Sequence, residues 1–141
     1  MVANLENMTC VFNMCNANYF EEKLPLPTFE VTHSYKNCAY FHFNYEWYGK
    51  RFYNPVIRFS DLYDFSEDMF IDIMCHEMIH YYLVYYDIDQ KCKHGKEFHE
   101  MAYKLNKKYH LNIIDDYVKQ NLKRNYDLPP MLFWTCKILQ I

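Results

Sequence analysis

The sequence predicts an α+β protein, because stretches with helical spacing of apolar residues surround a central stretch with the character of β-strands. The length of 141 residues fits one domain, and we expect residues 1–141 to form it. Half of the residues are hydrophobic and a fifth are aromatic, which is enough to bury a core and argues against a disordered chain. With only two glycines and five prolines, long flexible linkers are not expected.

The N-terminal part of the chain predicts a helix at residues 5–20 and then a strand. Apolar residues recur in the helix at helical spacing, at Leu5, Met8, Phe12, Cys15 and Tyr19. Pro25 and Pro27 end this pattern, because proline cannot continue a helix. Residues 28–35 follow with side chains that alternate between two faces, which is typical of a strand.

Two more strands are expected after this point. Residues 38–47 are rich in aromatic side chains and predict the second strand. Residues 54–60 predict the third, and Gly49 lies in a short polar segment that can turn the chain between them. The sequence therefore predicts a small sheet in the first half of the chain.

Residues 64–86 predict a long helix. Asp64 or Ser66 can cap its start, and Glu67 and Asp68 suit the first turn, where acidic side chains are stabilised by the helix dipole. The segment is apolar nearly all round, so we expect the helix to be buried on most sides.

The rest of the chain is less regular. It predicts a loop at 87–93, a helix at 94–110, a short helix at 113–122 and a break at Pro129 and Pro130. The apolar tail at 131–141 is too short to span a bilayer. We expect it to form a terminal strand or a docked segment.

Composition excludes several classes of protein. Formal net charge is −3 with acidic and basic residues interspersed, so no basic stripe indicates a nucleic-acid partner. Glu6 interrupts the place where a signal peptide would be apolar, and no apolar run approaches about 18 residues. Six cysteines without a C-x-x-C pair suggest reduced thiols. We therefore expect a cytoplasmic protein with no membrane partner.

The long helix carries the sequence His76-Glu77-Met78-Ile79-His80, which predicts a metal site. Residues four apart lie one turn apart on the same face, so the two histidines can point at one ion. The glutamate sits at the edge of that face, where it can act on water without being a ligand. Polar groups inside an apolar helix are costly to bury without partners, and a metal ion would be that partner.

A catalytic zinc needs a third protein ligand and an open position. The downstream candidates are Asp87, Asp89, His94, His99 and Glu100. Glu100 has the spacing of thermolysin-like enzymes, but Lys104 stands where that pattern has an aspartate.

Helix geometry separates these candidates. If residues 94–110 form one helix, its apolar stripe contains Phe98, and His94 falls within about 40° of that stripe. Glu100 points about 200° away, toward solvent, and His99 is also expected on a solvated face. We therefore expect His94 to be the third ligand, with Glu100 as the alternative.

These motifs resemble the SprT-like zinc metalloprotease domain, the family that includes the Spartan DNA–protein crosslink proteases. The resemblance rests on HEMIHYYL at 76–83 followed by HGKEF at 94–98, with support from 12–31 and 54–63. It covers about residues 5–110 and leaves 111–141 as a C-terminal extension.

The resemblance implies a zincin-like α+β fold, in which a small sheet packs on the active-site helix. It also implies that His76, His80 and His94 bind one catalytic Zn²⁺ and that Glu77 is the catalytic residue. Many relatives carry a C-terminal zinc ribbon with two cysteine pairs. Here only Cys136 resembles its beginning, and one cysteine cannot hold a structural zinc, so we expect the ribbon to be absent or truncated.

The sequence favours a zinc-dependent metalloendopeptidase that cleaves peptide bonds in protein or peptide substrates with Glu77 as general base. DNA-associated proteins are a candidate substrate class. One alternative is a metal-bound interaction module without catalysis, and another is a protease activated by DNA. Lys91, Lys93 and Lys96 could contact a polyanion, but solvated lysines are the simpler interpretation, and the net charge gives DNA no support.

Overall fold

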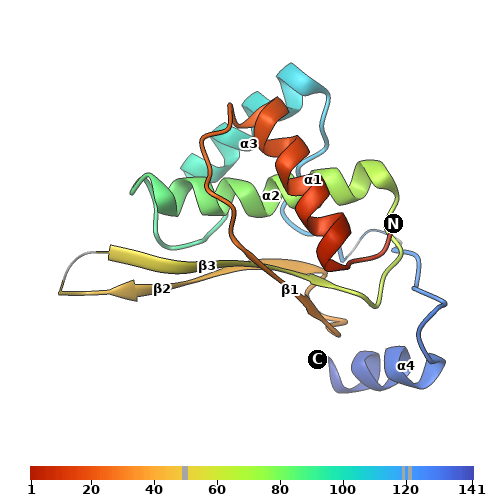
Figure 1. The fold of residues 1–141 in the computed structure, drawn as a ribbon. Helices are drawn as coiled ribbons and strands as arrows, with labels where there is room; N and C mark the ends of the chain where they lie inside the picture. Colours follow the sequence, from red (N-terminus) through yellow and green to blue (C-terminus); the bar gives the residue numbers. More distant parts are fainter. Residues whose placement is uncertain (49–50, 119, 121) are drawn as a thin grey trace.

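The computed structural model describes residues 1–48, 51–118, 120 and 122–141. Within these residues it contains four helices and one three-stranded sheet, which confirms the α+β class (Figure 1). The elements in chain order are α1 (Leu5–Tyr19), β1 (Thr28–Thr32), β2 (Ala39–Glu46), β3 (Arg51–Ser60), α2 (Glu67–Tyr85), α3 (Lys96–Tyr109) and α4 (Pro130–Leu139). Among the described residues, no helix combines the length and the hydropathy needed to cross a membrane.

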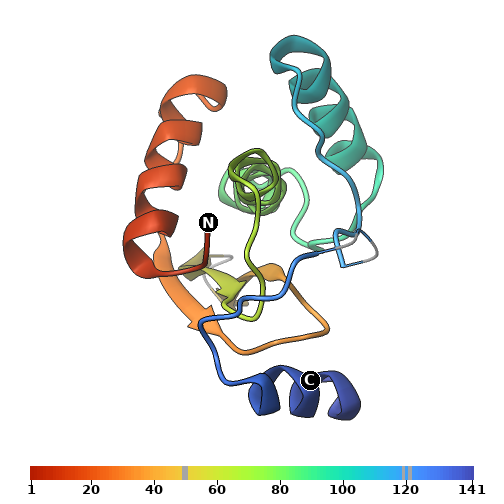
Figure 2. The same cartoon turned by 90° about the vertical axis from the view of Figure 1, so that its right-hand side faces the viewer.

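The sheet has the order β1-β3-β2, so β3 is the middle strand. β1 pairs with β3 in parallel, and β2 pairs with β3 in antiparallel fashion. Figure 2 shows α1, α2 and α3 above one face of this sheet, with α2 between the other two helices. β2 therefore has one edge paired with β3 and the other edge facing outward.

α2 is the centre of the core, as its all-round apolar pattern predicts. Ser66 caps the helix, because its hydroxyl accepts a hydrogen bond from the backbone N–H of Met69 at 3.1 Å. The helix packs against α1, α3, β2 and β3. Every residue from 73 to 81 on α2 is buried, so α2 is covered on all sides over this stretch.

The β2–β3 hairpin extends past the helices as a long arm (Figure 1). Its strand register shifts between His42 and Asn44, where β3 contains one extra residue. Asn54 has a φ of 54°, in the left-handed region, and is followed by Pro55. β3 thus begins at Arg51 rather than at Asn54, because Asn-Pro here forms a bulge inside the strand instead of a turn before it. The predicted turn at Gly49 lies outside the described residues.

Two predicted elements have different boundaries. β1 ends at Thr32 rather than at residue 35, and the Tyr35 N–H instead donates to the Ile141 carbonyl at 2.9 Å. α3 begins at Lys96, two residues later than predicted, with Gly95 as its N-cap. The start of α3 matters for the site, because it leaves His94 outside the helix.

The short helix predicted at residues 113–122 is wrong, since the described residues of this stretch are not helical. The Ile113 carbonyl, which a helix would use as an acceptor, is bound instead by a side chain. Asn106 accepts from the Ile113 N–H at 2.8 Å and donates to the Ile113 carbonyl at 3.0 Å, while the Tyr117 hydroxyl accepts from the Ile114 N–H at 3.0 Å. Such local bonds compete with helix formation.

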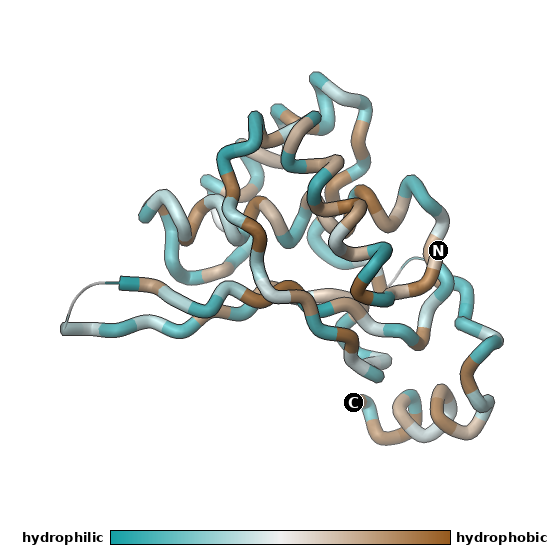
Figure 3. The backbone as a smooth tube through the Cα atoms, in the orientation of Figure 1, coloured by the Kyte–Doolittle hydropathy of each residue, from teal (hydrophilic) through white to brown (hydrophobic). Residues whose placement is uncertain are grey.

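The apolar tail forms α4, so the predicted terminal strand is wrong and the docked segment is confirmed. Pro130 occupies the first turn, where its missing N–H has no helical partner to lose. Cys136 is buried and its thiol donates to the His33 carbonyl at 3.2 Å, which fastens α4 below the sheet. Figure 3 shows the hydrophobic stretches of this helix, which lies apart from the other three.

Candidate metal centre

Three histidines converge beside the sheet. His76 and His80 lie one turn apart on α2, and His94 comes from the loop that precedes α3. One ring nitrogen from each lies within 4.8 Å of those of the other two, and the Nε2 atoms of His76 and His94 are 3.1 Å apart. This group could hold a metal ion.

The position of His94 does not come from the helical stripe that the sequence indicated. α3 starts at Lys96, so His94 is placed by the loop and not by helix geometry. The buried ring of Phe98 lies 4.7 Å from the ring of His94 and 4.8 Å from those of His76 and His80. Phe98 therefore packs against all three imidazoles and fixes the loop on α2.

His76 has a partner that orients its ring. Its Nδ1 lies 2.7 Å from the carbonyl oxygen of Ile114, an acceptor only, so Nδ1 carries the proton and donates. Nε2 then keeps a free lone pair, and that atom faces His94. Hydrogen bonds of this kind fix the tautomer and orientation of metal-binding histidines. Two imidazole nitrogens 3.1 Å apart need a proton or a cation between them, and the lone pair on His76 Nε2 lets these residues fit a shared cation.

Burial keeps two of the histidines neutral. It lowers the pKa of His76 to about 4, with His94 adding to the lowering and the Ile114 carbonyl opposing it. Burial also lowers the pKa of His80 to about 3, helped by the neighbouring His76 and His94. Both rings are therefore uncharged near pH 7, the form in which imidazole binds metals. The Nδ1 of His80 is buried with no hydrogen-bond partner in the described part of the structure.

Glu77 shares the pocket with these rings. Its carboxyl is buried, and burial raises its pKa to about 8, opposed by a hydrogen bond from the backbone N–H of Phe41 in β2. A carboxyl whose pKa lies near neutrality can both take and give a proton at physiological pH. A cation bound nearby would favour its ionised form.

The three histidines and Glu77 line a pocket of about 570 Å³. One wall is residues 36–41, which lead into β2. The opposite wall is residues 112–118, called here the wall segment, of which 115–118 line the pocket and Ile114 holds His76. Cys92, in the loop before His94, lines the pocket as well.

The wall segment was missed by sequence reasoning, which assigned it to a helix. Asp72 of α2 accepts from the Asn112 N–H at 3.0 Å, and Asn106 of α3 holds Ile113. Asp72 is 40 residues away from Asn112 in sequence, and Asn106 belongs to the preceding helix. No periodic pattern marks them, and the polar residues between two helical patterns were the only available signal.

The alternative ligands lie outside the histidine group and have other partners. Glu100 is exposed and lies 3.8 Å from the Nζ of Lys96. His99 is exposed, with its Nε2 3.0 Å from an oxygen of Asp115.

The two loop aspartates are also engaged. Asp87 accepts from the Gln90 amide at 2.6 Å, and Asp89 accepts from the Lys91 N–H at 3.0 Å. The described residues thus gather none of these four around the two helix histidines.

Comparison with protein-family models identifies a family. The model of the SprT-like family matches residues 8–121, which include most of α1 and all of the sheet, α2, α3 and the wall segment. A search of curated proteins gives no match. Two of the three histidines lie on a helix that packs against a small sheet, and the group fits a zincin-like arrangement. Because the match spans most of the sequence, the chain belongs to the SprT-like family.

Proposed function

We propose that the protein is a zinc-dependent metalloendopeptidase with Glu77 as its general base. The observation that carries this proposal is the convergence of His76, His80 and His94 in the pocket that also holds the Glu77 carboxyl. Membership of the SprT-like family supports a metalloprotease-like function. The cytoplasmic location stays a prediction from the sequence.

Zinc suits this donor set. Three imidazole ligands leave a fourth tetrahedral position open, which is typical of catalytic rather than structural zinc sites. Bound zinc supplies a Lewis acid that polarises a carbonyl and lowers the pKa of water. His76, His80 and His94 would hold the ion, and the Ile114 carbonyl would keep His76 in the correct tautomer.

Glu77 is the proposed general base and then the general acid. The attacking water gives a proton to the carboxylate while its oxygen bonds to the scissile carbonyl carbon. The carboxyl then delivers that proton to the leaving amine as the C–N bond breaks. Its burial and its pKa near neutrality support both halves of this transfer.

The outward edge of β2 would hold the substrate backbone. The Ser60 N–H donates to the Cys38 carbonyl at 2.8 Å, so Cys38 faces β3. Strand residues alternate, so the main-chain groups of Ala39 and Phe41 point away from β3. The Phe41 N–H donates to the Glu77 carboxyl, so this edge of β2 lies beside that carboxyl. An extended peptide can add a strand here through main-chain hydrogen bonds.

Activity of the purified protein against an unfolded protein substrate tests the proposal. We expect cleavage that stops when a chelator removes the metal and returns when zinc is added. Zinc content is measured on the same samples. Stoichiometric zinc with no cleavage of any substrate would reject the peptidase and favour a metal-bound interaction module.

DNA as an activator stays a separate prediction. Lys91, Lys93 and Lys96 are exposed on either side of His94, where a polyanion could approach. Salt-dependent retardation of DNA in a gel, with faster cleavage when DNA is added, would support it. DNA-associated proteins would then be the expected substrates.

A further inference from the structure

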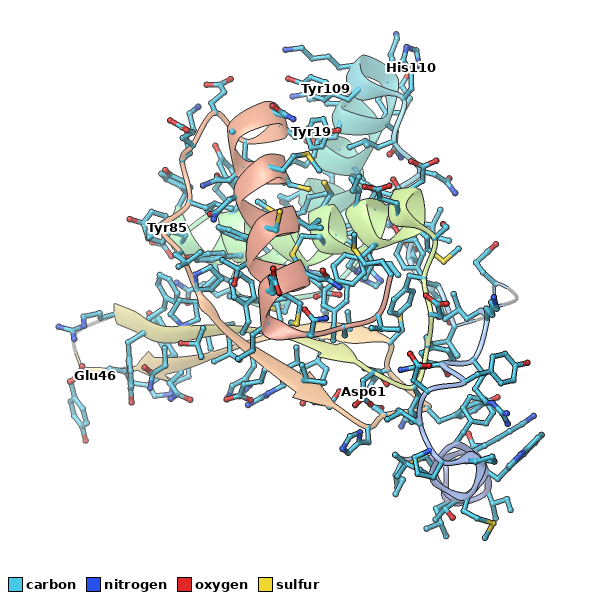
Figure 4. All side chains as sticks on the ribbon, turned by 45° about the vertical axis from the view of Figure 1, so that its right-hand side comes forward. Tyr19, Glu46, Asp61, Tyr85, Tyr109 and His110 are labelled. Atoms are coloured by element: carbon cyan, nitrogen blue, oxygen red, sulfur yellow. The ribbon has the colours of Figure 1, made fainter. Side chains whose placement is uncertain are left out.

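The hairpin arm continues the candidate substrate edge away from the pocket. We define the arm as residues 43–48 of the β2 side and 51–54 of the β3 side. It extends beyond the end of α2, where Tyr85 is the last helical residue (Figure 1). Figure 4 shows Glu46 at the far end of β2, well away from the helices. The arm therefore offers a backbone edge that the helices leave uncovered.

A row of aromatic side chains follows β2 along this edge, at Phe41, Phe43, Tyr45 and Trp47. Residues two apart in a strand share a face. The contacts agree, because Phe41 stacks on Phe43 with ring centroids 5.8 Å apart and Tyr45 meets Trp47 at 5.2 Å. Phe41 also stacks on Tyr81 of α2 at 5.3 Å, so the row lies on the α2 face of the sheet.

Burial changes sharply along the row. Phe41 is 8% exposed beneath α2, whereas Trp47 is 83% exposed. Phe43 is partly covered by Phe52, which in turn packs on Tyr85. Beyond that point the row has no helix above it. Trp47 lies just past the end of β2 beside the half-buried Tyr45, so the outer end of the row is an uncovered aromatic patch, and such patches mark binding sites.

The same residues also point their main-chain groups outward. Cys38 faces β3, so alternate residues of β2, including Phe41, Phe43 and Tyr45, have their N–H and C=O groups on the outer edge. A peptide that pairs with the Phe41 carbonyl at the pocket can therefore continue to pair along the arm, while the Phe41 N–H stays bonded to Glu77. Its alternate side chains would then lie beside the aromatic row.

Resting on the peptidase function, we propose that the arm is an extended substrate subsite. It binds unfolded polypeptide and selects aromatic or large aliphatic side chains on the N-terminal side of the scissile bond. The direction follows from strand pairing. β2 runs from the pocket outward, and an antiparallel partner runs from the arm tip toward the pocket. Residues that precede the scissile bond thus meet Phe43, Tyr45 and Trp47.

Three peptides long enough to span the eight residues of β2 test this subsite. One carries two aromatic residues, two apart, upstream of the cleavage point. A second carries serine at those positions, and a third carries the aromatic pair downstream instead. The host protein is Glu77→Gln with Trp134→Phe, in which Trp47 is the only tryptophan, because the sequence has two. Its fluorescence reports binding directly and does not require cleavage.

We expect the upstream peptide to bind about 3- to 10-fold more tightly than the serine peptide and to change the Trp47 emission. The downstream peptide should bind like the serine peptide. Removing the aromatic group with Trp47→Ala, read by labelled-peptide anisotropy, should erase most of the preference without unfolding the chain, because the side chain is largely exposed. Tyr103→Ala is the matched control, since Tyr103 is 65% exposed on α3, away from β2.

Equal affinity for all three peptides, or a preference that survives Trp47→Ala, would overturn the subsite. A preference for the downstream peptide would overturn its direction. These outcomes are distinct from failure of the peptidase function. If the wild-type protein cleaves the upstream and serine peptides with the same kcat/KM, the proposed subsite is rejected but the peptidase function is confirmed. If the upstream peptide binds at Trp47 but the wild-type protein cleaves none of the peptides, the proposed peptidase function is rejected.

Discussion

α2 and the wall segment face the same pocket, but they are built in different ways. α2 is a regular helix whose capping, apolar pattern and paired histidines all follow from local sequence. The wall segment has no helix among its described residues and is held by the side chains of Asp72, Asn106 and Tyr117. The candidate ligands on α2 are thus set by helix periodicity, whereas the orienting partner of His76 is set by tertiary contacts.

The largest effect should come from the α2 side of this comparison. Glu77→Gln keeps the shape of the side chain but cannot take up a proton. We expect peptide cleavage to fall by at least about 100-fold while bound zinc and the fold are kept. Cleavage assays, zinc analysis and circular dichroism measure the three properties. Cleavage at the wild-type rate would remove Glu77 from the mechanism.

The loop histidine tests whether the third ligand lies outside α2. His94→Ala should lower zinc affinity by more than about 100-fold, because a tetrahedral site loses one of three protein ligands. Glu100→Ala is the control, since Glu100 is exposed beside Lys96. Zinc content after dialysis is compared for the two variants. Loss of zinc in the Glu100 variant alone would show a thermolysin-like ligand set.

The buried histidines predict a pH dependence of stability in the metal-free protein. Their folded pKa values, about 4 for His76 and about 3 for His80, lie below the unfolded value near 6.5. The unfolded chain therefore binds more protons below pH 6.5, and stability is lost as pH falls from 6.5 to about 4. We expect a loss of about 3 kcal/mol or more across this window.

Urea unfolding of chelator-treated Glu77→Gln measures this loss without titration of the Glu77 carboxyl. In the wild type that carboxyl acts with the opposite sign. Its pKa is raised to about 8, so its contribution favours folding at low pH and is lost as pH rises from 4.5 through 8. A Glu77→Gln protein equally stable at pH 6.5 and pH 4 would contradict the assigned burial of the histidines.

A substitution that loosens the wall segment should lower zinc affinity less than the loss of a ligand does. Asn106→Ala removes both hydrogen bonds to Ile113 and should loosen the Ile114 carbonyl that orients His76. We expect zinc affinity to fall by about 10-fold, a typical cost of losing outer-shell support. Competition with a coloured chelator measures this.

Asn16→Ala is a matched control for that variant. The Asn16 amide likewise donates to the Leu24 carbonyl at 2.8 Å and accepts from the Leu24 N–H at 3.3 Å, at a place distant from the histidines. Its substitution should lower stability but leave zinc affinity unchanged. Equal loss of zinc affinity in both variants would indicate general destabilisation and not a role for the wall segment.

These contrasts explain which parts of the molecule could be predicted. α1 and α2 were predicted because their apolar spacing and the Ser66 cap agree with the final structure. The start of β3 was misplaced because Asn54-Pro55, a typical turn pair, forms a bulge in a strand. The helical pattern predicts that His94 lies on α3 and faces α2. The structure confirms that His94 lies beside the two α2 histidines, but α3 begins two residues after it, so the loop and not the helix places it there.

The C-terminal third was the least predictable. Residues 113–122 have a helix-like pattern, but the Ile113 and Ile114 carbonyls, which a helix would use as acceptors, bind the side chains of Asn106 and His76. The apolar tail was expected as a strand or a docked segment. It forms a helix because Pro130 suits a first turn, and its docking depends on Tyr35 and Cys136, which are far apart in sequence.

The central claim is that His76, His80 and His94 hold one zinc ion beside Glu77. A crystal structure of the zinc-loaded protein, with anomalous scattering measured at the zinc absorption edge, tests this claim most directly. We expect one ion at about 2.0–2.1 Å from one nitrogen of each histidine, with an open fourth position facing the pocket. An ion bound by Glu100 or by cysteines in place of His94, or no ion at this site in excess zinc, would contradict the claim.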